Sequence, residues 1–264
     1  MTTATTTPAI QPVKSFTTDA LTVQVYANRS DLSQSVARIT QAHLQAVLAA
    51  QGSAAVILAT GNSQIKFLEE LNRLGGVDWS RITLFHMDEY LGISGDHPAS
   101  FRRYMRERVT ARLHPRAFHY LEGDALLPMD ECDRYSALLQ AQPIDLCCLG
   151  VGENGHLAFN DPPIANFSDR RAVTIAKLDD ACRLQQVGEG HFPGLDAVPQ
   201  YALTLTIPTL LSARKLLCLC PEKRKAVAVK NALLGPISPA CPASVLRTSP
   251  HATLLLDTDS ASLL

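Results

Sequence analysis

A long apolar run that ends in glycines constrains the fold of this chain more than any other segment. Residues 144–149 read Ile-Asp-Leu-Cys-Cys-Leu and are followed by a Gly-Val-Gly turn. An apolar run of this length, bounded by turn residues, is typical of a strand that is covered on both faces of a sheet. The run Asn-Gly-His-Leu-Ala-Phe-Asn-Asp follows at 154–161. Ligands bind at the carboxyl ends of strands in open α/β sheets, so this segment predicts a binding site, although His156 in an ordinary loop would also fit.

A second strand end carries two adjacent carboxylates. The apolar residues 82–86 are followed by Met87, Asp88 and Glu89, with Tyr90 directly after them. A carboxylate that is partly desolvated after such a strand has a raised pKa, which suits it to proton transfer. The simpler alternative is a solvated pair in a loop.

A glycine loop after the strand at 54–59 predicts a phosphate-binding site. The loop leads directly into a helix, where free backbone N–H groups and the positive end of the helix dipole favour an anion. Many α/β turns use glycine and serine for geometry alone, so this signal is weak by itself. Because three polar strand ends are expected to meet at one edge of the sheet, they predict a pocket. The loop residues are Thr60, Gly61, Asn62 and Ser63.

Strand candidates alternate with helix candidates over most of the chain. This order predicts an α/β fold with a doubly wound, mostly parallel sheet and helices on both faces, as in Rossmann-like folds. We expect one domain over residues 20–264, preceded by a mobile tail over residues 1–19, which is rich in Thr, Ala and Pro. The expected strands are 21–27, 54–59, 82–86, 144–149, 172–175, 201–206, 216–220 and 252–256. The expected helices are 31–51, 64–74, 99–113, 129–140 and 222–234.

The composition indicates a globular protein whose partners are small molecules. Apolar residues make up 46% of the chain and charged residues 19%, which is typical of a packed domain. The formal net charge of −1 argues against nucleic acid or an anionic membrane as a partner, and no apolar stretch approaches the length of a membrane span. The seven cysteines lack regular spacing, so we interpret them as reduced core residues of a cytoplasmic protein. Cys218 and Cys220 would point to opposite faces of a strand, which argues against a metal site there.

Basic residues in two later segments are candidates for binding an anion. Lys223, Arg224 and Lys225 lie at the start of an expected helix, where positive charge opposes the helix dipole. This small cost indicates use by an anionic ligand, although a solvated face is the simpler interpretation for Lys223 and Arg224. Arg183 lies in a segment that could fold over the pocket.

The Met-Asp-Glu-Tyr motif at 87–90 and the segment 150–162 together resemble the glucosamine-6-phosphate deaminase (isomerase) family, which shares its fold with the 6-phosphogluconolactonases. The resemblance extends from residue 21 to residue 256. It implies an enzyme that converts glucosamine 6-phosphate into fructose 6-phosphate and ammonia. The implied reaction requires no metal and no organic cofactor, and its partner is a small sugar phosphate.

The resemblance also implies roles for individual residues. Asp88 would be the base that moves a proton between C2 and C1 of the sugar, and His156 would help to open the pyranose ring. Asp161 stands where the family usually has Glu after Phe-Asn, and Asn154 stands where many relatives have Asp. The residues expected to bind the substrate or its phosphate are Thr60, Gly61, Asn62, Ser63, Glu89, Arg183 and Lys225.

The two departures from the family pattern concern the partners of His156. Asn154 can orient the imidazole ring but cannot stabilise its positive charge. Asp161 is one methylene shorter than Glu, which leaves room for a water between its carboxylate and His156.

Two other functions fit the same motifs. A 6-phosphogluconolactonase could use His156 as a base in the same pocket, although such enzymes usually have Arg at the position of Tyr90. A non-catalytic sugar-phosphate sensor would bind its ligand without turnover, and the departures at Asn154 and Asp161 keep this alternative open. The motifs determine neither the sugar epimer nor whether the chain forms a homo-oligomer.

Overall fold

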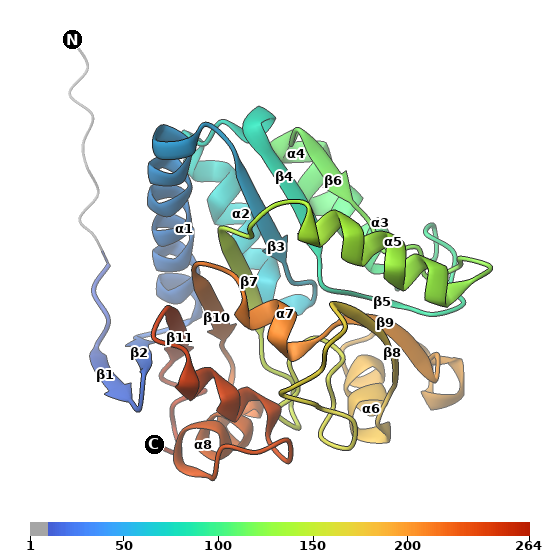
Figure 1. Cartoon of the computed structure of the whole chain (residues 1–264). Helices are drawn as coiled ribbons and strands as arrows, with labels where there is room; N and C mark the ends of the chain where they lie inside the picture. The colour runs from blue at the N-terminus through green and yellow to red at the C-terminus, as the bar shows by residue number, and fades with distance from the viewer. Residues whose placement is uncertain (1–9) are drawn as a thin grey trace.

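The computed structural model describes residues 10–264, which contain an eight-stranded main sheet of order β1-β2-β11-β10-β7-β3-β4-β6 (Figure 1). Neighbouring strands in this sheet are parallel, except for the antiparallel pair β1 and β2. The mostly parallel α/β sheet expected from the sequence is therefore confirmed. Its strands are β1 (Lys14–Thr18), β2 (Leu21–Tyr26), β3 (Ala54–Leu58), β4 (Ile82–His86), β6 (Ala117–His119), β7 (Leu146–Gly150), β10 (Leu216–Cys220) and β11 (Ala252–Asp257).

A second, antiparallel sheet has the order β5-β9-β8 and was not expected from the sequence. Its strands are β5 (Asp88–Tyr90), β9 (Tyr201–Leu205) and β8 (Val173–Lys177). The chain leaves the main sheet at His86 and joins the small sheet only two residues later, where Asp88 pairs with Thr204. The strands expected near 172–175 and 201–206 exist, but they belong to this small sheet rather than to the main one. This transition places Asp88 between the two sheets.

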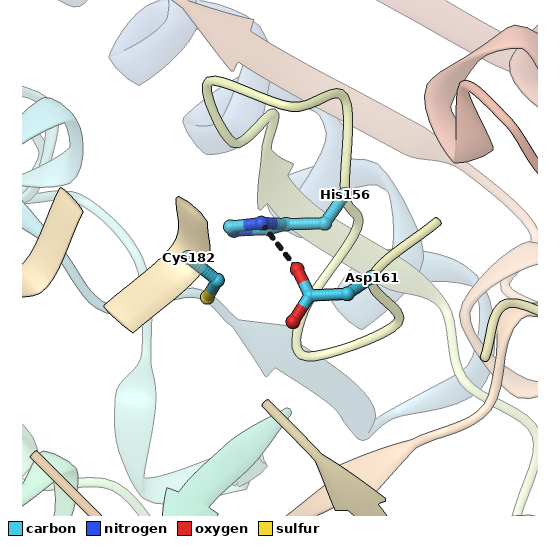
Figure 2. Close-up of side chains that lie close together, drawn as sticks. All are labelled: His156, Asp161 and Cys182. Atoms are coloured by element: carbon cyan, nitrogen blue, oxygen red, sulfur yellow. Dashed lines mark ion pairs between the residues drawn. The ribbon is translucent and has the colours of Figure 1, made fainter. Parts of the chain in front are cut away.

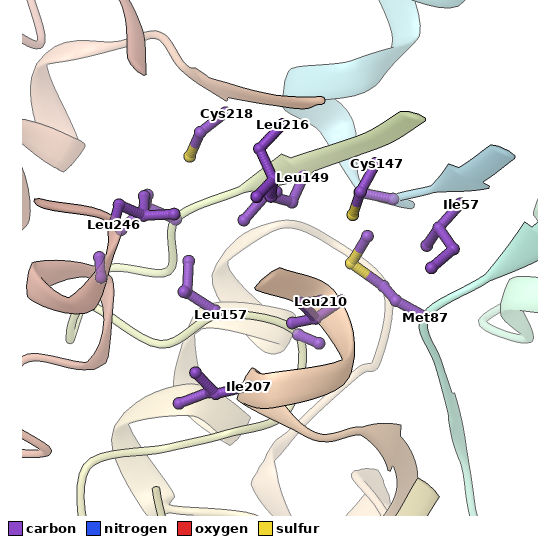
Figure 3. Close-up of a cluster of buried hydrophobic side chains, with 14 of the residues drawn as sticks. Ile57, Met87, Cys147, Leu149, Leu157, Ile207, Leu210, Leu216, Cys218 and Leu246 are labelled. Atoms are coloured by element: carbon purple, nitrogen blue, oxygen red, sulfur yellow. The ribbon is translucent and has the colours of Figure 1, made fainter. Parts of the chain in front are cut away.

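Helices cover both faces of the main sheet, as expected (Figure 1). Successive strand residues alternate between the faces, so Val56 and Leu58 pack with α1 and α2, whereas Ala55 and Ile57 pack with α5, α7 and α8. Figure 3 shows part of the second face, with Ile57 beside Met87 and with side chains of α7 below the strands. The helices are α1 (Arg29–Gln51), α2 (Asn62–Leu74), α3 (Phe101–Met105), α4 (Ala111–Leu113), α5 (Pro128–Gln140), α6 (Asp180–Gly188), α7 (Ile207–Leu211) and α8 (Ala226–Leu234).

Two expected boundaries differ from the structure. The predicted mobile tail is wrong for residues 14–18, because they form β1 and add an antiparallel edge strand to β2. Phe16 packs against the core there, which explains why this polar segment is ordered. Residues 1–9 of the predicted tail lie outside the described residues. The single helix expected over 99–113 is split into α3 and α4 by a π-helical turn at Arg106–Thr110.

Within residues 10–264, we find no helix that combines the length and the apolar character needed to cross a membrane.

Candidate active site

An open pocket of about 620 Å³ lies at the carboxyl ends of β3, β7 and β10, next to β5 of the small sheet. The three polar strand ends identified in the sequence therefore meet, as expected. Residues that were predicted for the site and line this pocket are Thr60, Gly61, Ser63, Asp88, His156 and Lys225. Lining residues that the sequence did not single out for the site include Gln185, Gln186 and Glu189.

The start of α2 presents backbone donors to one end of the pocket. Gly61 precedes the helix with φ +100 and ψ 164, a conformation that favours glycine, and its position carries no side-chain cap. Gln64 N donates to the carbonyl oxygen of Gly61 at 3.1 Å, which leaves the N–H groups of Asn62 and Ser63 at the start of the helix available to an anion. The Asn62 side chain is not part of the pocket wall, because it points to the carbonyl oxygen of Glu189 at 3.5 Å.

Lys225 supplies a buried positive charge at the same end. The residue is only 4% exposed, and burial lowers the pKa of its ammonium group. It lies in the short 3-10 turn Lys223–Lys225 that follows β10, so the end of a fourth strand contributes to the pocket. A buried cation beside free N–H groups is suited to a phosphate.

Arg224 is exposed, as the solvated-face interpretation expected, and it also lines the open pocket. Its Nη1 lies 2.8 Å from Oε1 of Glu189 and 3.2 Å from Oε1 of Glu153, and its Nε lies 2.7 Å from Oε2 of Glu222. Burial raises the pKa of Glu189, but contacts with His191 and Arg224 outweigh this effect and lower it to about 2. The Glu189 carboxylate is thus ionised and pairs with the Arg224 guanidinium.

Helix α6 forms the pocket wall that the sequence analysis missed. The Asp179 side chain accepts a hydrogen bond from Ala181 N and caps the helix. The carboxyl end of α6 lines the pocket through Gln185, Gln186 and Glu189. The acidic N-cap and the glycine at 188 were the available signals for this helix.

Asp88 lies in the pocket but is almost fully buried, with 6% of its surface exposed. Its Oδ1 has no hydrogen-bond partner among residues 10–264. Burial and, to a smaller extent, the charge of Glu89 raise the pKa of Asp88 well above its usual value. A desolvated carboxylate with a free oxygen is suited to accept a proton from a bound molecule.

Glu89 does not line the pocket, so its predicted contact with substrate is wrong. It follows Asp88 on β5 and therefore points to the opposite side. Its carboxylate accepts hydrogen bonds from Ser100 Oγ at 2.8 Å, Arg102 N at 2.9 Å and Phe101 N at 3.1 Å. Glu89 thus anchors the start of α3.

His156 is held by a buried carboxylate (Figure 2). Its Nδ1 lies 3.0 Å from Oδ1 of Asp161, which leaves Nε2 for the pocket. This direct contact leaves no gap for the water that the shorter Asp side chain suggested. Burial raises the pKa of Asp161, but contacts with His156 and hydrogen bonds from Asp179 N and Asn154 outweigh it and lower the pKa. A Cβ at Gly152 would collide with the imidazole ring, which explains the glycine at this position.

Asn154 and Asp161 contact His156 and do not line the pocket themselves. Asn154 Nδ2 donates to Asp161 Oδ1 at 3.1 Å, and Asn154 Oδ1 accepts from the backbone N–H of His156 at 3.0 Å. Asp179 N donates to Asp161 Oδ2 at 3.0 Å. These hydrogen bonds fix both members of the His156–Asp161 pair.

Arg183 is not part of the pocket, so its predicted contact with phosphate is wrong. Its Nη2 donates to the carbonyl oxygens of Leu195 at 2.8 Å and Val198 at 3.0 Å. Its Nη1 contacts Asp180 at 3.0 Å. Because these partners occupy the guanidinium group, Arg183 braces α6 against the segment that leads to β9.

Comparisons with known proteins agree with this geometry. Residues 27–255 match the family described as glucosamine-6-phosphate isomerases/6-phosphogluconolactonase. A glucosamine-6-phosphate deaminase of Exiguobacterium sibiricum is 37% identical over 207 residues, which cover 78% of this chain and 80% of the relative. A glucosamine-6-phosphate deaminase of Shewanella woodyi is 31% identical over 248 residues, which cover 91% of this chain and 90% of the relative.

Solved structures extend the comparison to the fold. A monomeric glucosamine-6-phosphate deaminase superposes with a TM-score of 0.83 at 34% identity, covering 92% of this chain and 99% of the other. A 6-phosphogluconolactonase of Shewanella baltica superposes with a TM-score of 0.73 at 19% identity, covering 89% of this chain and 97% of the other, which shows a shared fold only. On the extent of the family match and the identity to these relatives, the chain belongs to the glucosamine-6-phosphate isomerase/6-phosphogluconolactonase family.

Proposed function

We propose that this chain converts glucosamine 6-phosphate into fructose 6-phosphate and ammonia. The observation that carries the proposal is the position of Asp88, a desolvated carboxylate with a free oxygen in the same pocket as His156 and Lys225. Relatives that are 31–37% identical over most of the chain are glucosamine-6-phosphate deaminases.

The phosphate binds at the end of the pocket formed by α2 and the turn after β10. Backbone N–H groups of the Thr60–Ser63 loop and the Lys225 ammonium neutralise its charge, and Arg224 takes the place that the sequence analysis gave to Arg183. This remote contact orients the sugar so that its reacting carbons lie near Asp88.

Ring opening is assigned to His156. Its Nε2 faces the pocket and moves a proton between the anomeric hydroxyl and the ring oxygen. Asp161 fixes the ring orientation and stabilises the imidazolium that forms when Nε2 takes up a proton. Asn154 keeps Asp161 in place through its hydrogen bond of 3.1 Å.

Isomerisation is assigned to Asp88. Its carboxylate removes the proton from C2 of the open-chain sugar, which gives an enolamine, and returns a proton to C1. C2 is then an iminium carbon, to which water adds before ammonia leaves. A single carboxylate can serve both carbons because C1 and C2 are neighbours, and its raised pKa makes it a stronger base.

The proposal is tested by measuring ammonia release from glucosamine 6-phosphate and from its C2 and C4 epimers, with 6-phosphogluconolactone hydrolysis as the control. We expect ammonia and fructose 6-phosphate from glucosamine 6-phosphate and no catalysed hydrolysis of the lactone. Lactone turnover without ammonia from any amino sugar would assign the pocket to the lactonase reaction. Binding of the amino sugar without either product would assign it to a sensor.

A further inference from the structure

Cys182 lies beside the His156–Asp161 pair and has no role in the proposed reaction. It belongs to α6 and is 1% exposed. Figure 2 shows the Cys182 side chain beside the imidazole of His156 and the carboxylate of Asp161. One ligand atom from each residue lies within 4.8 Å of the others, and no second set of three His, Cys, Asp or Glu residues with this spacing occurs in the described part of the chain.

These three side chains offer a mixed nitrogen, oxygen and sulfur donor set, which is the kind of set that binds zinc. Zinc bonds of the usual length place tetrahedral ligand atoms roughly 3.3–3.8 Å apart. His156 Nδ1 and Asp161 Oδ1 are 3.0 Å apart and need only a small separation. Because the ligand atoms lie within 4.8 Å of one another, the sulfur needs to approach by at most about 1 Å, which a movement of one side chain on α6 can supply.

Charge balance and support around the ligands also favour a divalent cation. The Asp161 carboxylate and a Cys182 thiolate cancel the two charges of the ion, so the assembled site is neutral, as a buried site requires. The thiol proton leaves to solvent when the metal–sulfur bond forms. Asp161 is already oriented by Asn154 Nδ2 and Asp179 N, and such outer contacts fix ligands before a metal arrives.

We propose that His156, Asp161 and Cys182 bind one zinc ion and that this ion inhibits the enzyme. When the imidazole carries its proton on Nε2, the metal takes the Nδ1 lone pair together with the Asp161 carboxylate that otherwise orients the ring, so Nε2 can no longer take up a proton. It also ties α6 to the loop after β7. Because the ligands lie behind the pocket wall, except for His156, saturating sugar phosphate does not displace the ion. The inhibition rests on the proposed function, whereas the metal binding does not.

Cobalt is the spectroscopic probe for the binding step. We expect metal-free protein to take up one Co²⁺ per chain with a thiolate-to-cobalt band in the near ultraviolet and the strong visible bands of a tetrahedral site. Addition of zinc should remove the thiolate band and the visible bands, because zinc replaces cobalt in the site. Cys182→Ser should abolish the thiolate band and weaken zinc binding by roughly tenfold or more. The matched control is Cys241→Ser, which removes the half-buried thiol that lies against Gly155 in the loop after β7 and should leave the spectrum unchanged.

Activity is then measured with and without zinc. We expect zinc to inhibit ammonia release by wild type and by Cys241→Ser, and EDTA to restore it, whereas Cys182→Ser stays active in zinc. The proposed metal site is overturned if wild type shows no thiolate band, or if the band is lost in Cys241→Ser and kept in Cys182→Ser. If Cys182→Ser does not fold, Cys182→Ala and the wild-type spectrum decide the question. If metal-free protein releases no ammonia, the proposed function fails, and the cobalt spectrum still decides whether the metal site exists.

Discussion

The groups at the strand ends and the wall formed by α6 are held in place by different forces. Asp88 is fixed by the backbone pairing of β5 with β9 and is 6% exposed. Arg224, which meets the α6 wall through Glu189, has a side chain that is 31% exposed and depends on ion pairs with carboxylates from three separate segments. The proposed base Asp88 therefore lies on paired backbone, whereas part of the proposed phosphate site depends on side-chain ion pairs that can rearrange. We expect changes at the proposed proton-transfer groups to affect kcat, and changes at the phosphate-binding groups, which include Lys225 after β10 and the α6 wall, to affect KM.

The largest expected effect is that of Asp88→Asn on catalysis. The amide cannot accept the C2 proton, so kcat should fall by about 10²–10⁴-fold or more, while binding of the sugar phosphate persists. Exchange of solvent deuterium into C1 or C2 is the direct measurement. Exchange at the wild-type rate in this variant would mean that another residue is the base.

The same substitution should raise stability at neutral pH. Because the pKa of Asp88 is raised in the folded state, ionisation destabilises the fold as pH rises from about 4 through the folded-state value. Asn resembles the protonated form and avoids this cost. We therefore expect the Tm of Asp88→Asn to exceed that of wild type at pH 7 and the difference to vanish below pH 4. Equal Tm values at both pH values would show that Asp88 is solvated.

Asp161→Asn is the matching change at the other buried carboxylate, and we expect it to change Tm in the opposite direction. The pKa of Asp161 is lowered in the folded state, so its charge stabilises the fold above the unfolded value of about 4 and this contribution is lost as pH falls through the folded value. The variant should therefore have a lower Tm than wild type at pH 7, and the gap should close in acid.

The catalytic effect of Asp161→Asn should be confined to ring opening. Loss of the carboxylate removes the group that orients His156, which should slow turnover of the cyclic substrate by about 10–10³-fold. An open-chain analogue, which needs no ring opening, should retain most of its turnover rate. Equal losses on both substrates would show that the His156–Asp161 pair also serves the isomerisation step.

Lys225→Ala should mainly affect KM. A charge-assisted contact to phosphate is worth roughly 1.5–3 kcal/mol, so KM should rise by about tenfold or more with a smaller change in kcat. Lys223→Ala is the matched control, because Lys223 is in the same turn but is exposed and does not line the pocket. A similar rise in KM in both variants would reduce the role of Lys225 to general electrostatic attraction.

The difference between the two regions also explains what could be predicted from the sequence. Asp88, His156 and the loop at Thr60 follow apolar strands, and strand order alone brings such ends together. The substrate contacts predicted for Glu89 and Arg183 were wrong because adjacency in sequence does not decide which way a side chain points. The Glu89 carboxylate accepts from backbone N–H groups, and the Arg183 guanidinium donates to backbone carbonyl oxygens of another segment.

Glu189 and Arg224 could not be paired from the sequence for a related reason. They are 35 residues apart and meet only because α6 and the turn after β10 converge on the pocket. No local pattern encodes that approach, since an ion pair needs only the right charges at the right distance. The small sheet was missed because β5 has three residues, too few for a periodic signal.

The smallest expected effect is that of Glu189→Gln, which tests whether the wall is adjustable. Gln keeps the shape of the side chain and its contact with Arg224, but it removes a negative charge from a pocket that must bind a phosphate. Since partly exposed ion pairs contribute up to about 1 kcal/mol, we expect KM for glucosamine 6-phosphate to fall by roughly two- to fivefold, with kcat unchanged. The gain should shrink at high ionic strength, because salt screens exposed charges.

Glu153→Gln is the matched control, since Glu153 contacts the same Nη1 of Arg224 at 3.2 Å but does not line the pocket, and it should change KM less. A rise in KM in Glu189→Gln would mean that the carboxylate positions Arg224 for the phosphate rather than competing with it. In that case the wall would be as rigid as the strand ends.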